Sequence, residues 1–293
     1  MYVKCNRVHE YIVSHHNSQP SIRSLCVCDN TIPSMAARPK ILLLGDSLTQ
    51  LGWDGWVGQL AHVYQRRADV VNRGMSGYNT KWFLEYAKTS DVWLQGTVAL
   101  VVIFFGANDS SDAILNPRHH IPPDEFKQNL EKLVQLCEEH YGKDVGITIV
   151  TAPPVVHHQR LMFQKERFGD KATGELERTM ELSELYAQAA LDVAFKVNRP
   201  SIHLWKVMQE DENWESFFID GLHFSAQGND FVARAILSQV MVSNPHLFVH
   251  PCPTTQQWAN AASRCEALLH DGPYHEEIDH TNHMSAFQEH RTR

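Results

Sequence analysis

Five short strand-like runs alternate with helical patterns along the middle of the chain, and this alternation limits the possible folds more than any other feature. The runs lie at residues 41–44, 70–74, 97–105, 146–151 and 201–204. The helical patterns lie at residues 56–65, 80–88, 122–141, 175–198 and 225–242. Thr80 is expected to cap the second, and Leu185 is expected to face inward in the fourth. Short apolar runs without alternation are typical of strands buried on both faces of a parallel sheet. The sequence therefore predicts an α/β fold with a doubly wound, mostly parallel sheet.

The organisation of the rest of the chain follows from the limits of this pattern. Residues 39–245 are predicted to form one α/β domain. Residues 1–38 are polar and without clear period, so we expect a flexible N-terminal extension, in which Met35 is an alternative start. Residues 246–293 are expected to form a partly ordered tail with one short helix at 258–269. The polar, charged segment at 153–174 is predicted to be a loop or lid.

The composition of the chain limits which partners we expect it to bind and in which compartment we expect it to lie. The formal net charge is −8 and no long Lys/Arg run is present, so a nucleic-acid partner is not expected. No stretch reaches the roughly 18 apolar residues of a membrane helix, so stable membrane insertion is not expected. The first residues, MYVKCNRVHE, lack the apolar core of a secretory signal. A cytoplasmic location is the resulting expectation.

The cysteines and histidines give no indication of a metal site. Cys26 and Cys28 are too few for zinc, and no second pair has ligand spacing. The 18 histidines lie mostly in polar, loop-like context, and no HExxH motif occurs. The sequence therefore favours free thiols in a reducing compartment.

Polar residues in four loops at strand ends are candidates for a functional site. The loops contain GDS at 45–47, NRGMSGYNT at 72–80, FFGANDSS at 104–111 and FIDGLHFSAQGN at 218–229. In open α/β sheets, ligands bind outside the carboxyl ends of the strands. The candidate residues are Ser47, Gly77, Asn108, Asp109, Asp220 and His223.

Each candidate also has an ordinary structural interpretation. Ser47 could cap the helix that follows it, and Gly77 could supply a positive φ angle in a turn. Residues 108–109 could cap a turn or a helix, and residues 220–223 could form a solvated loop.

Taken together, the candidates satisfy the requirements of nucleophilic attack by serine. The Ser47 hydroxyl needs a base, which His223 can provide. Asp220 lies three residues before His223 and could hold the imidazole in the correct tautomer. The backbone amides of Ser47 and Gly77 and the side chain of Asn108 could bind the oxyanion. The G-x-S-x-G motif of α/β-hydrolases is absent around Ser47, which indicates a different fold.

The same motifs resemble those of the SGNH hydrolases, also called the GDSL esterase/lipase family. The similar blocks are GDS at 45–47, Gly77, GAND at 106–109 and DGLH at 220–223, within residues 40–243. The loops resemble most closely those of the isoamyl acetate-hydrolysing esterase group. The resemblance implies a flavodoxin-like three-layer α/β/α sandwich with a five-stranded sheet, and no metal or organic cofactor.

For the site, the resemblance implies Ser47 as nucleophile, Asp220 and His223 as the rest of a triad, and Gly77 and Asn108 as oxyanion donors. The resulting hypothesis is a serine carboxylic ester hydrolase that acts on small acyl esters, such as acetates. Alternatives on the same triad are a lipase or lysophospholipase, a polysaccharide O-deacetylase and an acyltransferase. Alternatives of other classes are a metal-dependent phosphoesterase using Asp46, Asp109 and His223, and a non-catalytic binding protein.

Overall fold

The computed structural model describes residues 38–89, 91–247, 278–279, 281–282 and 285. The predictions for residues 1–37, for a start at Met35 and for a tail helix at 258–269 lie outside the described residues.

Five parallel strands form one sheet in the order β2-β1-β3-β4-β5. The strands are β1 (Lys40–Gly45), β2 (Asp69–Gly74), β3 (Val98–Phe104), β4 (Gly146–Val150) and β5 (Ser201–Ile202). Gly45 at the end of β1 pairs with Gly74 of β2 and Phe104 of β3, so three strands end at one level. The predicted doubly wound parallel sheet is confirmed, and the loops after these strands leave from the same edge.

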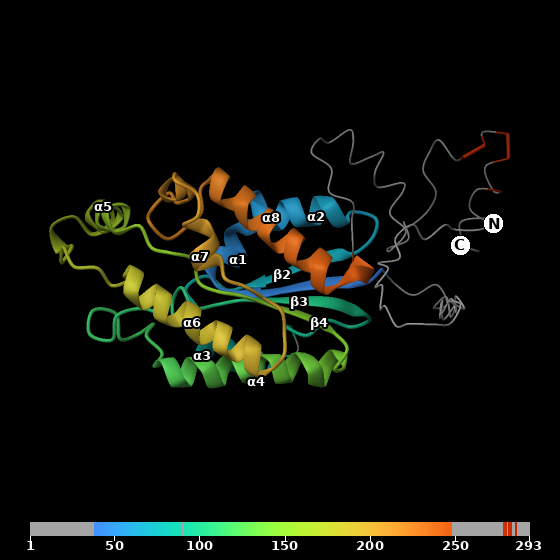
Figure 1. The fold of residues 1–293 in the computed structure, drawn as a ribbon, viewed down its shortest axis with the longest axis horizontal. Helices are drawn as coiled ribbons and strands as arrows, with labels where there is room; N and C mark the ends of the chain where they lie inside the picture. Colours follow the sequence, from blue (N-terminus) through green and yellow to red (C-terminus); the bar gives the residue numbers. More distant parts are fainter. Residues whose placement is uncertain (1–37, 90, 248–277, 280, 283–284, 286–293) are drawn as a thin grey trace, which may run out of the picture. The chain divides into compact units, whose positions relative to one another are not determined.

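Helices cover both faces of the sheet (Figure 1). The helices are α1 (Ser47–Gln50), α2 (Trp56–Tyr64), α3 (Thr80–Tyr86), α4 (Pro123–Tyr141), α5 (His157–Phe168), α6 (Met180–Lys196), α7 (Leu204–Met208) and α8 (Ala226–Ser243). Short 3-10 turns are η1 (Leu51–Asp54), η2 (Gly169–Lys171), η3 (Trp214–Phe217) and η4 (Pro245–Leu247). Helices α2 and α8 lie on one face, whereas α3, α4 and α6 lie on the other.

The apolar core has two halves because successive side chains of a strand point to opposite faces. Ile41 and Leu43 of β1 pack in the cluster that contains residues of α2 and α8. Leu42 and Leu44 pack in the cluster that contains residues of α3, α4 and α6. These unbroken apolar strands therefore lie between two helical layers, and the predicted three-layer α/β/α sandwich is confirmed.

The prediction of a loop at residues 153–174 is wrong, because α5 and η2 occupy most of that segment, and the alternative of a lid stays a prediction. The buried residues of α5 are Arg160 and Gln164, which lie one helical turn apart. A helix whose inward face is polar has no apolar stripe, so its sequence reads as a loop.

Two details of the predicted helices also differ from the structure. Leu185 of α6, predicted to face inward, is 49% exposed, and Tyr186 is buried instead. The Tyr186 hydroxyl donates a hydrogen bond to the carbonyl of Ile121, which satisfies its polar end inside the core. Thr80, predicted as the cap of α3, is preceded by the actual N-cap Asn79, whose side chain accepts from the amide of Trp82.

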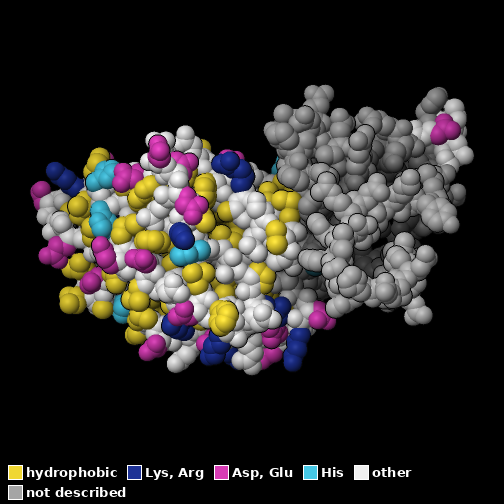
Figure 2. Space-filling view, in the orientation of Figure 1, with side chains coloured by type: hydrophobic (Ala, Val, Ile, Leu, Met, Phe, Trp, Pro, Cys, Tyr) yellow, Lys and Arg dark blue, Asp and Glu magenta, His cyan; other side chains and the backbone are white. Residues whose placement is uncertain are grey.

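The surface drawn in Figure 2 shows Lys and Arg side chains interspersed with Asp and Glu, and no continuous basic area. No helix within the described residues combines the length and apolar character needed to cross a membrane.

Candidate active site

Ser47 is the first residue of α1, is separated from the end of β1 by Asp46 alone, and is 6% exposed. The cap of this helix is Asp46, whose Oδ1 accepts from the amide of Leu48 at 2.9 Å. The Ser47 hydroxyl is therefore not used as the helix cap. Gly45 permits this tight turn, since a Cβ at that position would lie 2.1 Å from Thr49 Oγ1.

Asp220 and His223 lie in a tight loop before α8. The loop is closed by the Phe218–Phe224 bridge, and the amide of Ile219 donates to the carbonyl of His223 at 2.9 Å. Gly221 takes a φ of +79° inside the loop, and a Cβ there would lie 2.4 Å from the carbonyl oxygen of Val156. A glycine is therefore needed both for the turn and for the contact with the start of α5.

The structure brings Ser47, His223 and Asp220 together in one chain of hydrogen-bond contacts. His223 Nε2 lies 3.0 Å from Ser47 Oγ, although the two residues are 176 positions apart. His223 Nδ1 lies 2.7 Å from Asp220 Oδ2. The other oxygen of Asp220 accepts from the amides of Leu222 at 3.0 Å and His223 at 2.7 Å.

These contacts keep Asp220 ionised in a mostly buried position. Burial alone would raise the pKa of Asp220, but hydrogen bonds from the side chain and backbone of His223 outweigh it and lower the pKa to about 2. The Asp220 carboxylate can therefore accept a hydrogen bond from a protonated Nδ1 of His223 over the whole physiological pH range. In that tautomer Nε2 is free to accept the hydroxyl proton of Ser47.

Gly77 and Asn108 lie beside Ser47 and line the same pocket. Gly77 has a φ of +78°, and a Cβ there would meet only His119 Nε2, at 3.9 Å. The conformation of the turn, and not crowding by the protein, therefore requires glycine. Among the described residues, the backbone N–H groups of Ser47 and Gly77 have no hydrogen-bond acceptor.

Asn108 is 5% exposed, and its side-chain nitrogen donates to the carbonyl of Tyr78 at 3.0 Å. A primary amide has two N–H donors, so one remains for another acceptor. Three donors that could serve a substrate oxygen thus belong to residues that line one pocket.

The pocket over Ser47 has a volume of about 590 Å³, and α5 and η2 form much of its wall. Phe163 and Phe168 line this pocket. Trp56 is also aromatic and lies close to Ser47 in the sequence, but it is completely buried in the core. Arg167 and Lys171 border the same wall. The wall of this pocket therefore combines apolar and cationic side chains.

Asp46 and Asp109 are buried carboxyl groups behind the site. Burial raises the pKa of Asp46 to about 6 and that of Asp109 to about 7. Asp109 Oδ1 accepts from the amide of Thr80 at 2.9 Å and from its hydroxyl at 2.5 Å. No group of three or more His, Cys, Asp and Glu side chains suited to a metal occurs within the described residues. The donor set proposed for a metal-dependent phosphoesterase is therefore not assembled there.

Three charged residues near the site were missed by sequence reasoning: Arg160, Glu177 and Arg178. They line the pocket, and they connect to both Asp220 and Asn108. Arg160 lies among the charges of a segment without apolar period, which is also typical of an exposed loop. Glu177 and Arg178 lie at the start of the helical pattern predicted at 175–198 and have no signal of their own.

Comparison with known proteins decides the family. The sequence profile of the GDSL-like lipase/acylhydrolase family matches residues 43–231 of the 293-residue chain. The chain belongs to this family. The matched range includes Ser47, Gly77, Asn108, Asp220 and His223, and the resemblance noted in the sequence is confirmed.

Two relatives are similar over most of their length. A GDSL esterase/lipase from Arabidopsis thaliana is 33% identical over 257 residues, which cover 86% of this chain and 98% of the relative. The isoamyl acetate-hydrolyzing esterase 1 homolog from Bos taurus is 36% identical over 200 residues, which cover 66% of this chain and 78% of the relative. The chain is a carboxylic ester hydrolase of the GDSL family.

Solved structures share the fold. The lipase/acylhydrolase from Enterococcus faecalis has a TM-score of 0.52 and 25% identity, and covers 69% of this chain and 95% of that protein. The acetylxylan esterase Axe2 from Geobacillus stearothermophilus has a TM-score of 0.54 and covers 71% and 96%. Its 19% identity shows a common fold and nothing more.

Proposed function

We propose that this GDSL-family esterase cleaves small acyl esters, such as acetates, with Ser47 as nucleophile, His223 as base and Asp220 as the carboxylate that orients the base. The observation that carries the proposal is the continuous contact chain of 3.0 Å from Ser47 Oγ to His223 Nε2 and 2.7 Å from His223 Nδ1 to Asp220 Oδ2. These separations suit proton transfer between a hydroxyl and an imidazole.

The first half-reaction forms an acyl-enzyme. His223 Nε2 takes the proton of Ser47 Oγ as the oxygen attacks the ester carbonyl carbon. Asp220 stabilises the resulting imidazolium. The tetrahedral intermediate then breaks its bond to the alkoxy oxygen, His223 returns the proton to that oxygen, and the alcohol leaves.

The second half-reaction repeats these steps with water. His223 takes a proton from a water molecule, whose oxygen attacks the acyl carbon. The bond from that carbon to Ser47 Oγ breaks, and the proton returns to Ser47 as the carboxylic acid leaves. In both halves the backbone N–H groups of Ser47 and Gly77 and the remaining N–H of Asn108 would bind the oxyanion.

The small-ester assignment is supported by the relatives named as homologs of an isoamyl acetate-hydrolyzing esterase. A lipase or lysophospholipase, a polysaccharide O-deacetylase and an acyltransferase would use the same centre with other acyl chains or acceptors. A series of acyl lengths on one leaving group, with and without an alcohol acceptor, distinguishes these reactions. The cytoplasmic location stays a prediction, and cell fractionation tests it.

Replacing the nucleophile tests the proposal directly. In Ser47→Ala we expect hydrolysis of p-nitrophenyl acetate to fall at least about a thousandfold, because the acyl-enzyme can no longer form. A fluorophosphonate probe should label the unmodified protein at Ser47 and leave Ser47→Ala unlabelled. Ser243→Ala, which removes a hydroxyl at the end of α8, is the control and should retain activity and labelling. Wild-type turnover in Ser47→Ala would refute the assignment.

A further inference from the structure

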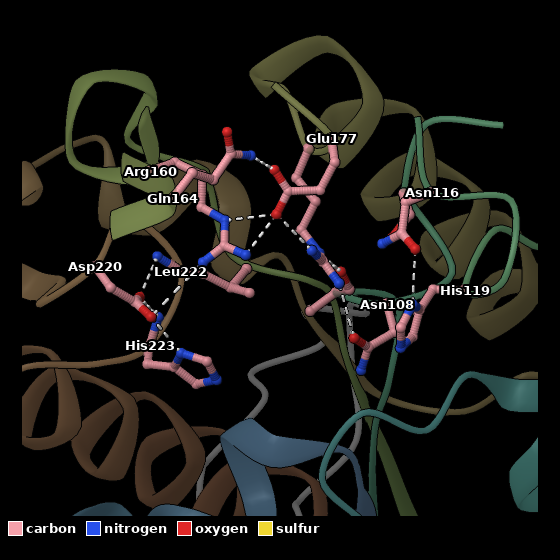
Figure 3. A network of polar contacts seen from close by, with 12 residues as sticks. Asn108, Asn116, His119, Arg160, Gln164, Glu177, Asp220, Leu222 and His223 are labelled. Atoms are coloured by element: carbon pink, nitrogen blue, oxygen red, sulfur yellow. Dashed lines mark hydrogen bonds and ion pairs between the residues drawn. The ribbon is translucent and has the colours of Figure 1, made fainter. Parts of the chain in front are cut away.

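Glu177 stands between the two halves of the candidate site (Figure 3). Its Oε1 accepts from Arg160 Nε at 2.8 Å, from Arg160 Nη2 at 2.5 Å and from Arg178 Nη1 at 2.9 Å. Its Oε2 accepts from the amide of Gln164. The side chains of Glu177, Arg160 and Arg178 are only 14%, 9% and 7% exposed, so these contacts are shielded from water.

On one side of Glu177, Arg178 determines how the amide of Asn108 is oriented. Arg178 Nη2 donates to Asn108 Oδ1 at 3.0 Å, and Arg178 Nε donates to the carbonyl of Ala107 at 2.8 Å. A guanidinium can only donate, and the carbonyl of Tyr78, on the other side of the amide, can only accept. The oxygen of Asn108 must therefore face Arg178, and its NH₂ group must face Tyr78. Asn108 and Ser47 line the same pocket.

On the other side of Glu177, Arg160 approaches the carboxylate that contacts His223. Arg160 Nη1 lies 3.7 Å from Asp220 Oδ2, the same oxygen that lies 2.7 Å from His223 Nδ1. That separation is an ion pair without a hydrogen bond, and Arg160 Nη1 has no hydrogen-bond partner within the part of the chain that the structure describes. Glu177 holds two other nitrogens of this guanidinium, so it limits how closely Arg160 can approach Asp220.

We propose that Glu177 is a positioning residue that, through Arg160 and Arg178, holds the triad carboxylate Asp220 and the oxyanion donor Asn108 in one rigid frame. The inference rests on the proposed function, since it gives Asp220 and Asn108 the roles assigned there. Glu177 touches no reacting atom in this arrangement. It acts by keeping Arg178 against Asn108 and by keeping Arg160 from competing with His223 for Asp220.

The charges along the frame alternate in sign. Asp220, Arg160, Glu177 and Arg178 sum to zero, so removing the charge of Glu177 leaves one net positive charge in the frame. Arg160 Nη1, 3.7 Å from Asp220 Oδ2, is then free to move closer to that oxygen and to compete with His223 Nδ1 for it.

Glu177→Gln keeps the shape of the side chain and removes its charge. We expect kcat for p-nitrophenyl acetate to fall by about 10- to 100-fold with KM within about threefold, because misplacement affects the transition state more than substrate binding. Glu166→Gln, the same change on an exposed residue of α5, is the control and should alter neither quantity.

Arg178→Lys separates orientation from charge. Lysine keeps the positive charge but cannot reproduce the three directed bonds to Ala107, Asn108 and Glu177. We expect a similar fall in kcat, again with KM within about threefold. This variant also decides the matter if Glu177→Gln does not fold, as judged by its thermal unfolding.

The outcomes separate the two proposals. Absence of fluorophosphonate labelling in the unmodified protein would contradict the proposed function itself. Normal labelling and turnover of the unmodified protein, together with unchanged kcat in Glu177→Gln or Arg178→Lys, would overturn only the positioning role. A fall in kcat/KM of Glu177→Gln that comes from KM alone would also overturn it, since misplacement of Asp220 and Asn108 affects the transition state more than substrate binding.

Discussion

At the scale of single residues, Asn108 combines near-complete burial with an amide whose two ends have fixed partners. Its carbonyl oxygen accepts from Arg178 and one N–H donates to Tyr78, so these two contacts fix the orientation of the second N–H, which is the donor proposed for the oxyanion. Preorganised donors of this kind stabilise an oxyanion without reorganising during the reaction.

Removing the Asn108 amide should therefore affect the chemical step. We expect Asn108→Ala to lower kcat for p-nitrophenyl acetate by about 10²- to 10³-fold with little change in KM. Asn213→Ala, on an exposed turn, is the matched deletion and should leave kcat unchanged. The loss in Asn108→Ala should exceed that in Arg178→Lys, which retains the donor but frees its orientation. A change confined to KM would argue that Asn108 binds substrate without stabilising the transition state.

The residues that the sequence predicted for the site differ from those that it missed in the signal that they carry. Ser47, Asp220 and His223 were predicted because serine chemistry requires these residue types, and their loops follow recognisable strand ends. Arg160, Glu177 and Arg178 were missed because a buried ion network has no periodic signature. A buried arginine and an exposed arginine look the same in a sequence, since only the folded chain brings Glu177 between them.

At the scale of secondary-structure elements, the connection between α3 and the loop after β3 depends on Thr80. Its hydroxyl donates to Asp109 and accepts from the side-chain nitrogen of Asn129 in α4 at 3.0 Å. Thr80 is completely buried, so water cannot replace either bond. Asn79 serves as the helix cap, which leaves the Thr80 hydroxyl available for Asp109.

Thr80→Val should show how much this connection stabilises the fold. The two side chains have nearly the same shape, but valine leaves Asp109 and Asn129 each short of one buried partner. We expect a loss of about 1–3 kcal/mol in the free energy of unfolding. The midpoint of thermal unfolding should fall by roughly 2–4 °C for each kcal/mol.

The control is Thr89→Val, which removes an exposed hydroxyl bonded to Tyr86 and should cost less than about 0.5 kcal/mol. Equal effects of the two changes would contradict a structural role for the Thr80–Asp109 bonds.

The type of each helix or strand was predictable where its buried side chains are apolar. The prediction failed where the buried side chains are polar. The pattern at 122–141 predicted α4 almost to the residue, because Phe126, Leu130 and Leu133 mark one buried stripe. In α5 the residues at the corresponding inward positions are Arg160 and Gln164, and the helix was mistaken for a loop. Helix periodicity in a sequence reports apolar burial, so a helix that supports an active site with polar side chains escapes it.

At the scale of the whole molecule, the five-stranded sheet was predictable because each strand is a short, nearly continuous apolar run. The order β2-β1-β3-β4-β5 brings the ends of β1, β2 and β3 to one edge, and the loops after them place Ser47, Gly77 and Asn108 around one pocket. The separation of 3.0 Å between Ser47 and His223 could not be derived from spacing along the chain. It depends on the final loop docking against the start of α5, where the amide of Val156 donates to the carbonyl of Gly221 at 3.0 Å.

The buried carboxyl groups under the site make the stability of the whole fold depend on pH. The pKa of Asp46 is raised to about 6 and that of Asp109 to about 7, from a usual 3.8. Between the unfolded and folded values the folded state binds more protons, so these groups lower stability as pH rises toward 7 and above. Asp220 behaves oppositely: its pKa is lowered to about 2, so its contribution is present above 3.8 and is lost only as pH falls through about 2.

Asp109→Asn should reduce this dependence on pH. Asparagine can still accept from Thr80 through its oxygen, but it never has to be ionised in the buried site. We therefore expect the variant to gain stability relative to the unmodified protein between pH 5 and pH 8, by up to about 4 kcal/mol. The measurement is the midpoint of thermal unfolding of both proteins at several pH values. Comparing the two proteins removes common contributions such as that of His119, whose pKa is lowered by burial.

Asp144→Asn, at an exposed carboxyl, is the control and should show the same stability at each pH as the unmodified protein. A difference between Asp109→Asn and the unmodified protein that stays constant from pH 5 to pH 8 would mean that Asp109 keeps the same charge throughout, contrary to the protonation that its burial implies.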